Sequence, residues 1–394
     1  MLAGKPCPAS VTQSLSELAD LAHEKMRSAP PTALRIWQVL YADACVLCAL
    51  AIQDFSTASR SIDLLDRAII IAGGGGGDES RLDLILSLIN KIQQKFLPPQ
   101  IPSRKFLNKG HQPSSETSLL TAQHEVSAIT SNLSFISFQN THSKAPFVIR
   151  GYAKDWPALK ENSWNSIDYL LSISGPSRVV PVEIGYDYRD DSWSQAIMQW
   201  EYFLDSIGDV SDSRKDSYLY LAQHNLFRQF PSLRRDITIP DYVYCALTPQ
   251  DFPDYKPLEN AEGTLLNMWL GPKGATSPAH FDPYYNLYVQ IVGYKTVWLG
   301  PPKATPYMET NFPKRRPDHP HGASSCEDTN LPNTSRLDVF SRASDVENDV
   351  EFIENVVPNA MQVVLGPGDL LFFPPGWWHG MRSETTSFSV SMWF

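Results

Sequence analysis

The chain has 394 residues, of which 42% are hydrophobic and 19% charged, with a formal net charge of −10 and a pI near 5.4. Single hydrophobic cores rarely grow beyond about 300 residues, so we expect two folded units. The acidic balance argues against broad binding of a nucleic-acid backbone, which needs a basic surface.

Residues 11 to about 97 are predicted to form helices. Apolar residues recur at three- and four-residue spacing through 11–26, 34–55 and 61–72. The longest apolar run, near residues 33–54, contains Arg35, Gln38 and Asp43, so we expect a core helix there and not a membrane span. This pattern predicts an all-α N-terminal domain over residues 1–105.

Two motifs in the helical part have structural interpretations. Gly73–Gly77 is followed by no Gly-Lys-Ser/Thr, so a connecting loop is favoured over a phosphate-binding loop. Cys45 and Cys48 form a C-x-x-C inside an apolar run, without a second cysteine pair to complete a zinc site. We interpret them as buried structural thiols, with a redox or metal role as the alternative. Five scattered cysteines indicate a reducing compartment.

The composition changes to Pro, Ser and Lys after Leu97, and we predict a linker over residues 106–145. Beyond it, short aromatic or β-branched runs bounded by Gly and Pro predict a mostly β domain over residues 146–394, a sandwich or barrel. Residues 303–355 are polar and are expected to be an insertion between strands. Its PKRRP stretch, Pro313–Pro317, is either a nuclear signal or a solvated loop.

The stretch Ser277–Lys295, SPAHFDPYYNLYVQIVGYK, opens with two metal-ligand types, His280 and Asp282. At positions i and i+2 of a strand their side chains leave the same face. A second histidine, His379, follows in PPGWWHG between two predicted strands. Together they would form the facial triad of non-haem Fe(II) oxygenases, with three coordination positions open for a chelating cosubstrate and O2. The alternative is that both histidines only hydrogen-bond within turns.

The residues after Asp282 alternate in polarity. The same parity predicts that four side chains face inward with Asp282: Tyr284, Asn286, Tyr288 and Gln290. It predicts that three face outward: Leu287, Val289 and Ile291. Lys295 follows a Gly in the same predicted sheet. A 2-oxoglutarate molecule that chelates iron would leave its C5 carboxylate deep in the barrel, where a cation would form a charge-assisted hydrogen bond. A snorkelling surface lysine is the alternative.

The region from about Phe147 to Phe394 resembles the JmjC-domain oxygenases, and among them the JmjC domain-containing protein 5 (lysine demethylase 8) type. The segments that carry the resemblance are VPVEIGYDYRDDSWSQAIM, YLAQHNLF, IPDYVY, NMWLGPKGATSPAHFDPYYNLYVQIVGYK, LPNTSRLDV and FSVSMWF. The resemblance implies a double-stranded β-helix, a jelly-roll or cupin-like barrel, preceded by the all-α domain.

The resemblance also implies roles for individual residues. Fe(II) would be held by His280, Asp282 and His379. The 2-oxoglutarate would lie against Tyr220, Ser277, Asn286, Lys295 and Trp393, with Tyr220 and Lys295 on its C5 carboxylate. The substrate groove would be lined by Glu183, Tyr188, Trp193, Gln223, Trp269 and Trp393. An acidic side chain beside aromatics suits a guanidinium or a methylammonium. Barrel core is the alternative role for each tryptophan.

Two departures from the family pattern concern substrate choice. Phe281 stands between the ligands, where a polar residue is common in relatives. The insertion at 303–330 is longer than expected and contains His319, His321 and Cys326, which either bind a further metal or are unpaired loop residues.

The resemblance implies an Fe(II)- and 2-oxoglutarate-dependent protein oxygenase that consumes O2 and releases succinate and CO2. Arginine hydroxylation is favoured because the branch resembles single-domain hydroxylases and no histone-reader module is recognisable. Lysine demethylation and a non-catalytic interaction module are the alternatives. The expected partner is a protein or peptide presenting Arg or methyl-Lys, without direct nucleic-acid or membrane binding. We expect a monomer, since no helices follow the last strand, located in the nucleus or the cytoplasm.

Overall fold

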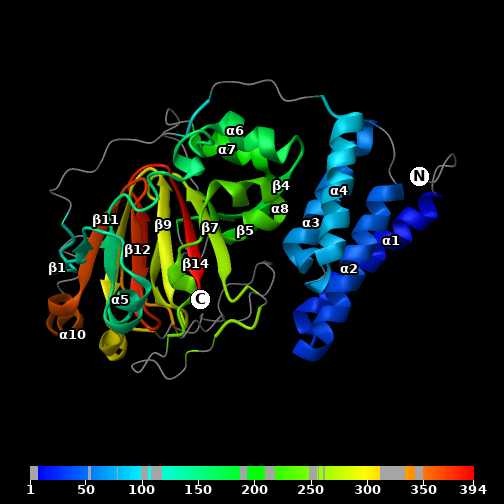
Figure 1. Cartoon of the computed structure of the whole chain (residues 1–394). Helices are drawn as coiled ribbons and strands as arrows, with labels where there is room; N and C mark the ends of the chain where they lie inside the picture. The colour runs from blue at the N-terminus through cyan, green and yellow to red at the C-terminus, as the bar shows by residue number, and fades with distance from the viewer. Residues whose placement is uncertain are drawn as a thin grey trace.

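The computed structural model describes residues 8–51, 55–77, 79–98, 105–107, 118–186, 193–208, 218–247, 255, 257–260, 262–310, 333–341 and 349–394. Four helices come first and lie at one side of a β-rich body (Figure 1). They are α1 (Ala9–Ser28), α2 (Pro31–Ala51), α3 (Ala58–Gly76) and α4 (Glu79–Phe96), with the 3₁₀ turn η1 (Phe55–Thr57) before α3.

The helices bury their apolar stripes against one another, with α2 packed between α1 and α3. By length and composition, α2 is the one helix of the described residues that could cross a membrane, and 39% of its most apolar window is buried. Core helices of bundles have the same features. Gly73–Gly77, which connect α3 to α4, all have positive φ, from 59° to 109°. Glycine adopts this conformation without a Cβ penalty.

Cys45 and Cys48, on α2, are buried, as is Cys245 outside the helical part. None of the three forms a disulfide among the described residues. Burial raises the pKa of the Cys45 thiol to about 12. A thiolate, which redox chemistry or zinc binding needs, is therefore disfavoured. This supports the structural interpretation of the C-x-x-C.

Two facing sheets form the β-rich body. The five-stranded sheet has the order β1 (His124–Glu125), β11 (Met361–Leu365), β10 (Lys295–Gly300), β13 (Trp378–Ser383), β8 (Thr276–Phe281). The nine-stranded sheet has the order β2 (Ala128–Ile129), β3 (Phe147–Ile149), β12 (Leu370–Phe373), β9 (Asn286–Val292), β14 (Ser387–Trp393), β7 (Leu265–Gly271), β6 (Leu219–His224), β4 (Val179–Ile184), β5 (Ser194–Gln199). This confirms the expected barrel preceded by helices.

Short helices cover the outer faces of the sheets. They are α5 (Phe135–Asn140), η2 (His142–Lys144), η3 (Pro157–Leu159), α6 (Ile167–Ser174), α7 (Trp200–Gly208), α8 (Leu226–Gln229), η4 (Pro231–Asp236), η5 (Asp241–Tyr244), η6 (Pro302–Tyr307), α10 (Val350–Asn355) and η7 (Val357–Asn359). The core is layered because side chains alternate along each strand. In β9, Leu287, Val289 and Ile291 pack outward, whereas Tyr288 joins the cluster between the sheets, as the parity predicted.

The predicted boundaries at residues 105 and 145 stay predictions. Within the predicted linker, β1 already pairs with β11, and β2 with β3. Of the predicted insertion, η6, residues 333–341 and α10 are described. Pro313–Pro317, His319, His321 and Cys326 lie outside the described residues.

Gly293 makes the turn that leads from β9 into β10, two residues before Lys295. Its φ is 70°, and a Cβ built on it would overlap the backbone oxygen of Thr386. Backbone cannot move aside as a flexible side chain can. The position therefore demands glycine on both conformational and steric grounds.

The substitution Gly293→Ala is expected to lower the free energy of unfolding by about 3 kcal/mol or more, from the left-handed φ and the backbone overlap together. Gly263→Ala is the matched control, because Gly263 has a φ of 59° but open space around its Cβ position. Its loss should be about 1 kcal/mol. Urea unfolding followed by tryptophan fluorescence measures both values, and equal losses would contradict the steric argument.

Candidate active site

His280 and His379 lie opposite each other on paired strands. The antiparallel register of β8 and β13 places them as direct partners, with ring centroids 4.2 Å apart. Oδ2 of Asp282 lies 3.4 Å from Nε2 of His379 and 4.0 Å from Nε2 of His280. One ligand atom from each residue lies within 4.8 Å of the other two, so the three could hold a metal ion. β8 ends at Phe281, so Asp282 reaches this group from the following turn.

The backbone sets the orientation of both imidazoles. Nδ1 of His280 lies 2.8 Å from the carbonyl oxygen of Pro278, and Nδ1 of His379 lies 3.0 Å from that of Trp377. A carbonyl oxygen only accepts, so Nδ1 of each ring is the donor, and Nε2 is the ring atom that faces Asp282. Metal-binding histidines commonly have this second hydrogen bond.

The charge states of the group also suit a metal. Burial, and then the neighbouring His379, lowers the pKa of His280 to about 4. Burial alone would raise the pKa of Asp282, but the interactions with His379 and His280 outweigh it and lower that pKa. A neutral imidazole and an ionised carboxylate are the forms that coordinate metal ions.

Phe281 does not face the metal ligands. Its ring lies 5.0 Å from that of Trp378, against the cluster on the outer side of the five-stranded sheet. Its backbone N–H donates to Asn333 and its carbonyl accepts from the side chain of the same residue, at 3.1 and 3.0 Å. The departure from the family pattern at this position therefore leaves the triad untouched, and Phe281 anchors the end of β8.

Lys295 is a cation inside the barrel, with 1% of its surface exposed. Its Nζ lies 2.9 Å from the hydroxyl of Tyr288 and 3.3 Å from that of Tyr220. Among the described residues, no carboxylate forms an ion pair with it. Burial lowers its pKa to about 7. Such a group is complementary to an anion that enters the barrel.

The barrel interior also holds polar atoms that have no hydrogen-bond partner among the described residues: Asn286 Oδ1, Trp393 Nε1 and Asn267 Nδ2. Asn286 and Trp393 are direct partners in the pairing of β9 with β14, and Asn267 lies on the neighbouring strand β7 opposite Ser391. Buried polar atoms are normally hydrogen-bonded, so the set suits a polar ligand. Ser277, on β8, is buried as well.

Three of the predicted groove residues, Glu183, Gln223 and Trp269, lie on the neighbouring strands β4, β6 and β7, whereas Trp193 directly precedes β5 and Trp393 lies on β14. Glu183 is the direct partner of Tyr220, and its Oε2 accepts from Nε1 of Trp193 at 3.4 Å. Burial raises the pKa of the Glu183 carboxyl, although the hydrogen bonds from Trp193 and Gln195 oppose it. The ring of Trp269 lies 6.2 Å from that of Tyr220. Gln223 is exposed, with a φ of 49°. Tyr188 lies outside the described residues.

Sequence reasoning missed two polar residues of the interior. Tyr288, expected inward from parity, was given no role, yet it makes the shorter hydrogen bond to Lys295. Asn267 alternates along β7 with Leu266 and Met268, which pack outward. The signal that could have found Asn267 is this alternation, since a polar residue within an apolar strand faces the same side as Trp269.

Comparison with known proteins identifies the relatives. Residues 136–394 match the Cupin-like domain family. Jumonji C domain-containing protein 5 of Drosophila melanogaster is 36% identical over 250 residues, covering 63% of this chain and 54% of that protein. Lysine-specific demethylase 8 of Danio rerio is 37% identical, covering 64% of this chain and 53% of that protein. The aligned part thus spans about half the length of these two relatives.

A third relative extends over the helical part. Lysine-specific demethylase JMJ30 of Arabidopsis thaliana is 29% identical over 413 aligned residues, covering 97% of this chain and 86% of that protein. The family match covers every described strand from β3 onward and the His280, Asp282 and His379 group. The chain therefore belongs to the Cupin-like domain family, and within the aligned part it is similar to Jumonji C domain-containing proteins.

Proposed function

We propose that this protein is an Fe(II)- and 2-oxoglutarate-dependent protein oxygenase that hydroxylates an arginine side chain. The observation that carries the proposal is the buried Lys295, which shares the barrel interior with the His280, Asp282 and His379 group. A metal site alone would fit many chemistries. A metal site with a buried cation facing the same interior fits a cosubstrate that has a chelating end and a second carboxylate.

The three ligands would hold Fe(II) and leave coordination positions free. Bound Fe(II) with 2-oxoglutarate and O2 supplies the oxidising chemistry, in which the cosubstrate yields succinate and CO2 and a substrate C–H gains a hydroxyl group. The chain itself fixes the ligands through backbone carbonyls, at 2.8 and 3.0 Å from the two Nδ1 atoms. It also shields His379 and Asn286 from water, at 2% and 3% exposed, whereas the side chains of His280 and Asp282 remain accessible at 16% and 13%.

Lys295 and Tyr220 would take the C5 carboxylate of 2-oxoglutarate, and Ser277, Asn286 and Trp393 would be hydrogen-bonding neighbours. An incoming carboxylate would give Lys295 its missing counter-ion and favour the charged amine. The unpartnered Oδ1 of Asn286 and Nε1 of Trp393 would gain partners. The ligand thus fits the donor and acceptor set of the interior.

An arginine side chain suits the residues around Tyr220. The carboxyl of Glu183 is partly desolvated, which raises its pKa, and a guanidinium would favour its ionised form. A guanidinium also pairs with a carboxylate through two parallel hydrogen bonds and stacks on rings such as those of Trp193 and Trp269. We therefore propose Glu183, Tyr188, Trp193, Gln223 and Trp269 as substrate contacts.

Demethylation of N-methyl-lysine is the second candidate, supported by the names of the Danio rerio and Arabidopsis thaliana relatives. Both reactions begin with hydroxylation of a C–H. A hydroxyl on an N-methyl group leads to loss of that methyl, whereas a hydroxyl on an arginine carbon is retained. A monomeric state, a nuclear or cytoplasmic location and the absence of direct nucleic-acid contacts stay predictions.

Lys295→Met is expected to stabilise the ligand-free protein while abolishing 2-oxoglutarate binding. The folded-state pKa of about 7 lies below the ordinary 10.5, so the folded protein binds fewer protons than the unfolded chain between these values. Buried Lys295 therefore costs more stability as the pH falls through this window, and the cost is complete below it. At pH 6 the variant should gain about 2 kcal/mol or more in the free energy of unfolding, with a smaller gain at pH 9.

Urea unfolding of metal-free protein at the two pH values measures the stability, and titration calorimetry with Mn(II) present measures 2-oxoglutarate binding. The control is Lys303→Met, because Lys303 is exposed and, among the described residues, its Nζ bonds the Asn359 side chain. A variant that is less stable than wild type at pH 6, or that keeps wild-type affinity for 2-oxoglutarate, would contradict the assignment.

Mass spectrometry of arginine-containing and methyl-lysine-containing peptides distinguishes the candidate reactions. With Fe(II), 2-oxoglutarate and ascorbate, we expect arginine to gain one oxygen and succinate to form in step with it. His280→Ala should show neither, because the metal would lose a ligand. Loss of a methyl group from lysine would establish the second candidate instead. If wild type forms no succinate, with or without peptide, the barrel is a non-catalytic interaction module and the proposal fails.

A further inference from the structure

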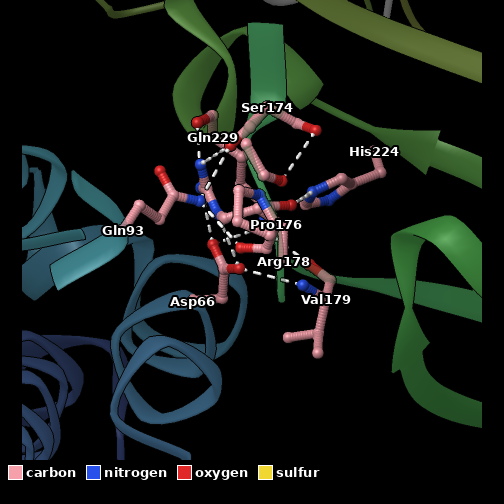
Figure 2. A network of polar contacts seen from close by, with 9 residues as sticks. Asp66, Gln93, Ser174, Pro176, Arg178, Val179, His224 and Gln229 are labelled. Atoms are coloured by element: carbon pink, nitrogen blue, oxygen red, sulfur yellow. Dashed lines mark hydrogen bonds and ion pairs between the residues drawn. The ribbon is translucent and has the colours of Figure 1, made fainter. Parts of the chain in front are cut away.

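A buried ion pair joins the helical part to the barrel. Asp66 on α3 is 0% exposed and Arg178, just before β4, is 4% exposed. The guanidinium donates two hydrogen bonds to the carboxylate, at 2.9 Å from Nε and 2.7 Å from Nη2. Figure 2 shows the pair at the centre of a polar network. Removing one partner of a buried pair leaves an uncompensated charge, so each depends on the other.

The Asp66 carboxylate holds more than its counter-ion. It also accepts from the backbone N–H of Val179 at 2.9 Å and from Nε2 of Gln229 at 2.8 Å (Figure 2). Arg178 in turn donates to the carbonyl oxygens of Ser174 and Gln229, at 3.3 and 3.0 Å. Four donors from the barrel side thus converge on one carboxylate of the helical part.

A second helix holds the same segment of the barrel. Nε2 of Gln93, on α4, donates to the carbonyl oxygens of Ser174 and Pro176 at 3.2 and 2.8 Å. The approach is close enough that a Cβ on Gly175 would meet the Gln93 amide. Arg228 donates to Glu79 and to the carbonyl oxygen of Gly73, at 3.0 and 3.1 Å. The helical part is therefore fastened through several specific polar contacts.

The network leads to two of the strands that carry proposed groove residues, β4 and β6. Val179 is the first residue of β4, which carries Glu183. Gln229 bonds the carbonyl oxygen of Val179 at 2.9 Å and accepts from Nε2 of His224 at 2.7 Å. His224 is the last residue of β6, the strand of Tyr220 and Gln223.

This end of β6 is irregular and needs support. Its pairing with β7 shifts register between Leu221 and His224, and Gln223 has a φ of 49°. A left-handed φ in a non-glycine residue costs about 1–2 kcal/mol and persists only where the surroundings hold it. Two hydrogen bonds stabilise this end of β6: His224 donates to Gln229, and Gln229 donates to Asp66.

We propose that Asp66 is a positioning residue of the oxygenase: through Arg178, Val179 and Gln229 it fixes β4 and β6, so that Glu183, Tyr220 and Gln223 meet the cosubstrate and the protein substrate. This inference rests on the proposed function. The helical part is then a component of the site. The metal ligands of strand origin lie on β8 and β13 of the other sheet, so Asp66 controls 2-oxoglutarate and peptide binding and leaves metal binding unchanged.

The test is Asp66→Asn, which keeps the side-chain shape and removes the charge. Apparent affinities for 2-oxoglutarate and for peptide should fall about five- to tenfold, whereas kcat and Mn(II) affinity stay within about twofold of wild type. Hydrogen–deuterium exchange should accelerate in residues 179–184 and 219–224, but not in 276–281 or 378–383.

The matched control is Asp63→Asn, one turn earlier on α3. Its 2.8 Å ion pair with Arg67 is partly exposed and internal to the helix. The control should behave as wild type.

A second variant keeps the test open if Asp66→Asn does not fold. His224→Leu leaves the ion pair intact and cuts the link to β6, so exchange should accelerate in 219–224 alone, again with weaker 2-oxoglutarate binding. A folded Asp66→Asn protein with wild-type exchange in β4 and β6 and wild-type affinities would overturn the proposal. If wild type binds Mn(II) but turns over no 2-oxoglutarate, the proposed function fails, while the exchange measurement still decides whether Asp66 orders these strands.

Discussion

The pairing of β13 between β8 and β10 is the constraint on which the rest of the site depends. His379 of β13 lies opposite His280 on one side and Leu299 on the other, and Ser383 at its far end lies opposite Lys295. A slip of one residue in a strand exchanges its two faces. One register therefore fixes the metal ligands and also determines that Lys295 enters the same interior.

The barrel interior contains apolar side chains that stabilise the fold and polar groups that lower its stability. Apolar side chains from both sheets fill the space between them, while Lys295 and the unpartnered Asn286, Trp393 and Asn267 atoms lie buried in the same barrel. Buried polar groups without partners lower the stability of the folded state. Sites that bind charged ligands commonly carry such a cost. Asp66 and Arg178 are also buried charges, but they form an ion pair in which each charge compensates the other.

Local patterns in the sequence predicted much of this arrangement. The alternation after Asp282 predicted that Asn286, Tyr288 and Gln290 turn inward, because side chains in a strand alternate whatever its neighbours are. Gln290 indeed bonds Ser387 and Ser389 of β14 at 2.9 and 2.7 Å. The same stretch does not form one strand, since β8 and β9 belong to different sheets. The metal-binding role of the triad was predicted from residue types and spacing, whereas the roles of the groove residues came from the family resemblance. Both stay proposals.

What could not be predicted depends on which distant segments become neighbours. The order of the strands brings Tyr288 next to Lys295 and Asn267 next to β14. Local sequence patterns do not contain that order. In the sequence, Asp66 has the pattern of an ordinary polar residue in an amphipathic helix. Its partner Arg178 is 112 residues away along the chain. Only the packed structure shows that both are buried. The contribution that we propose for the helical part could therefore not be predicted from the sequence.

A crystal structure of the protein with Mn(II) and 2-oxoglutarate tests the central claim most directly. The account predicts the metal on His280, Asp282 and His379, and the distal carboxylate of 2-oxoglutarate on Lys295 and Tyr220. A cosubstrate bound elsewhere, with Lys295 still bonded only to the hydroxyls of Tyr220 and Tyr288, would contradict it.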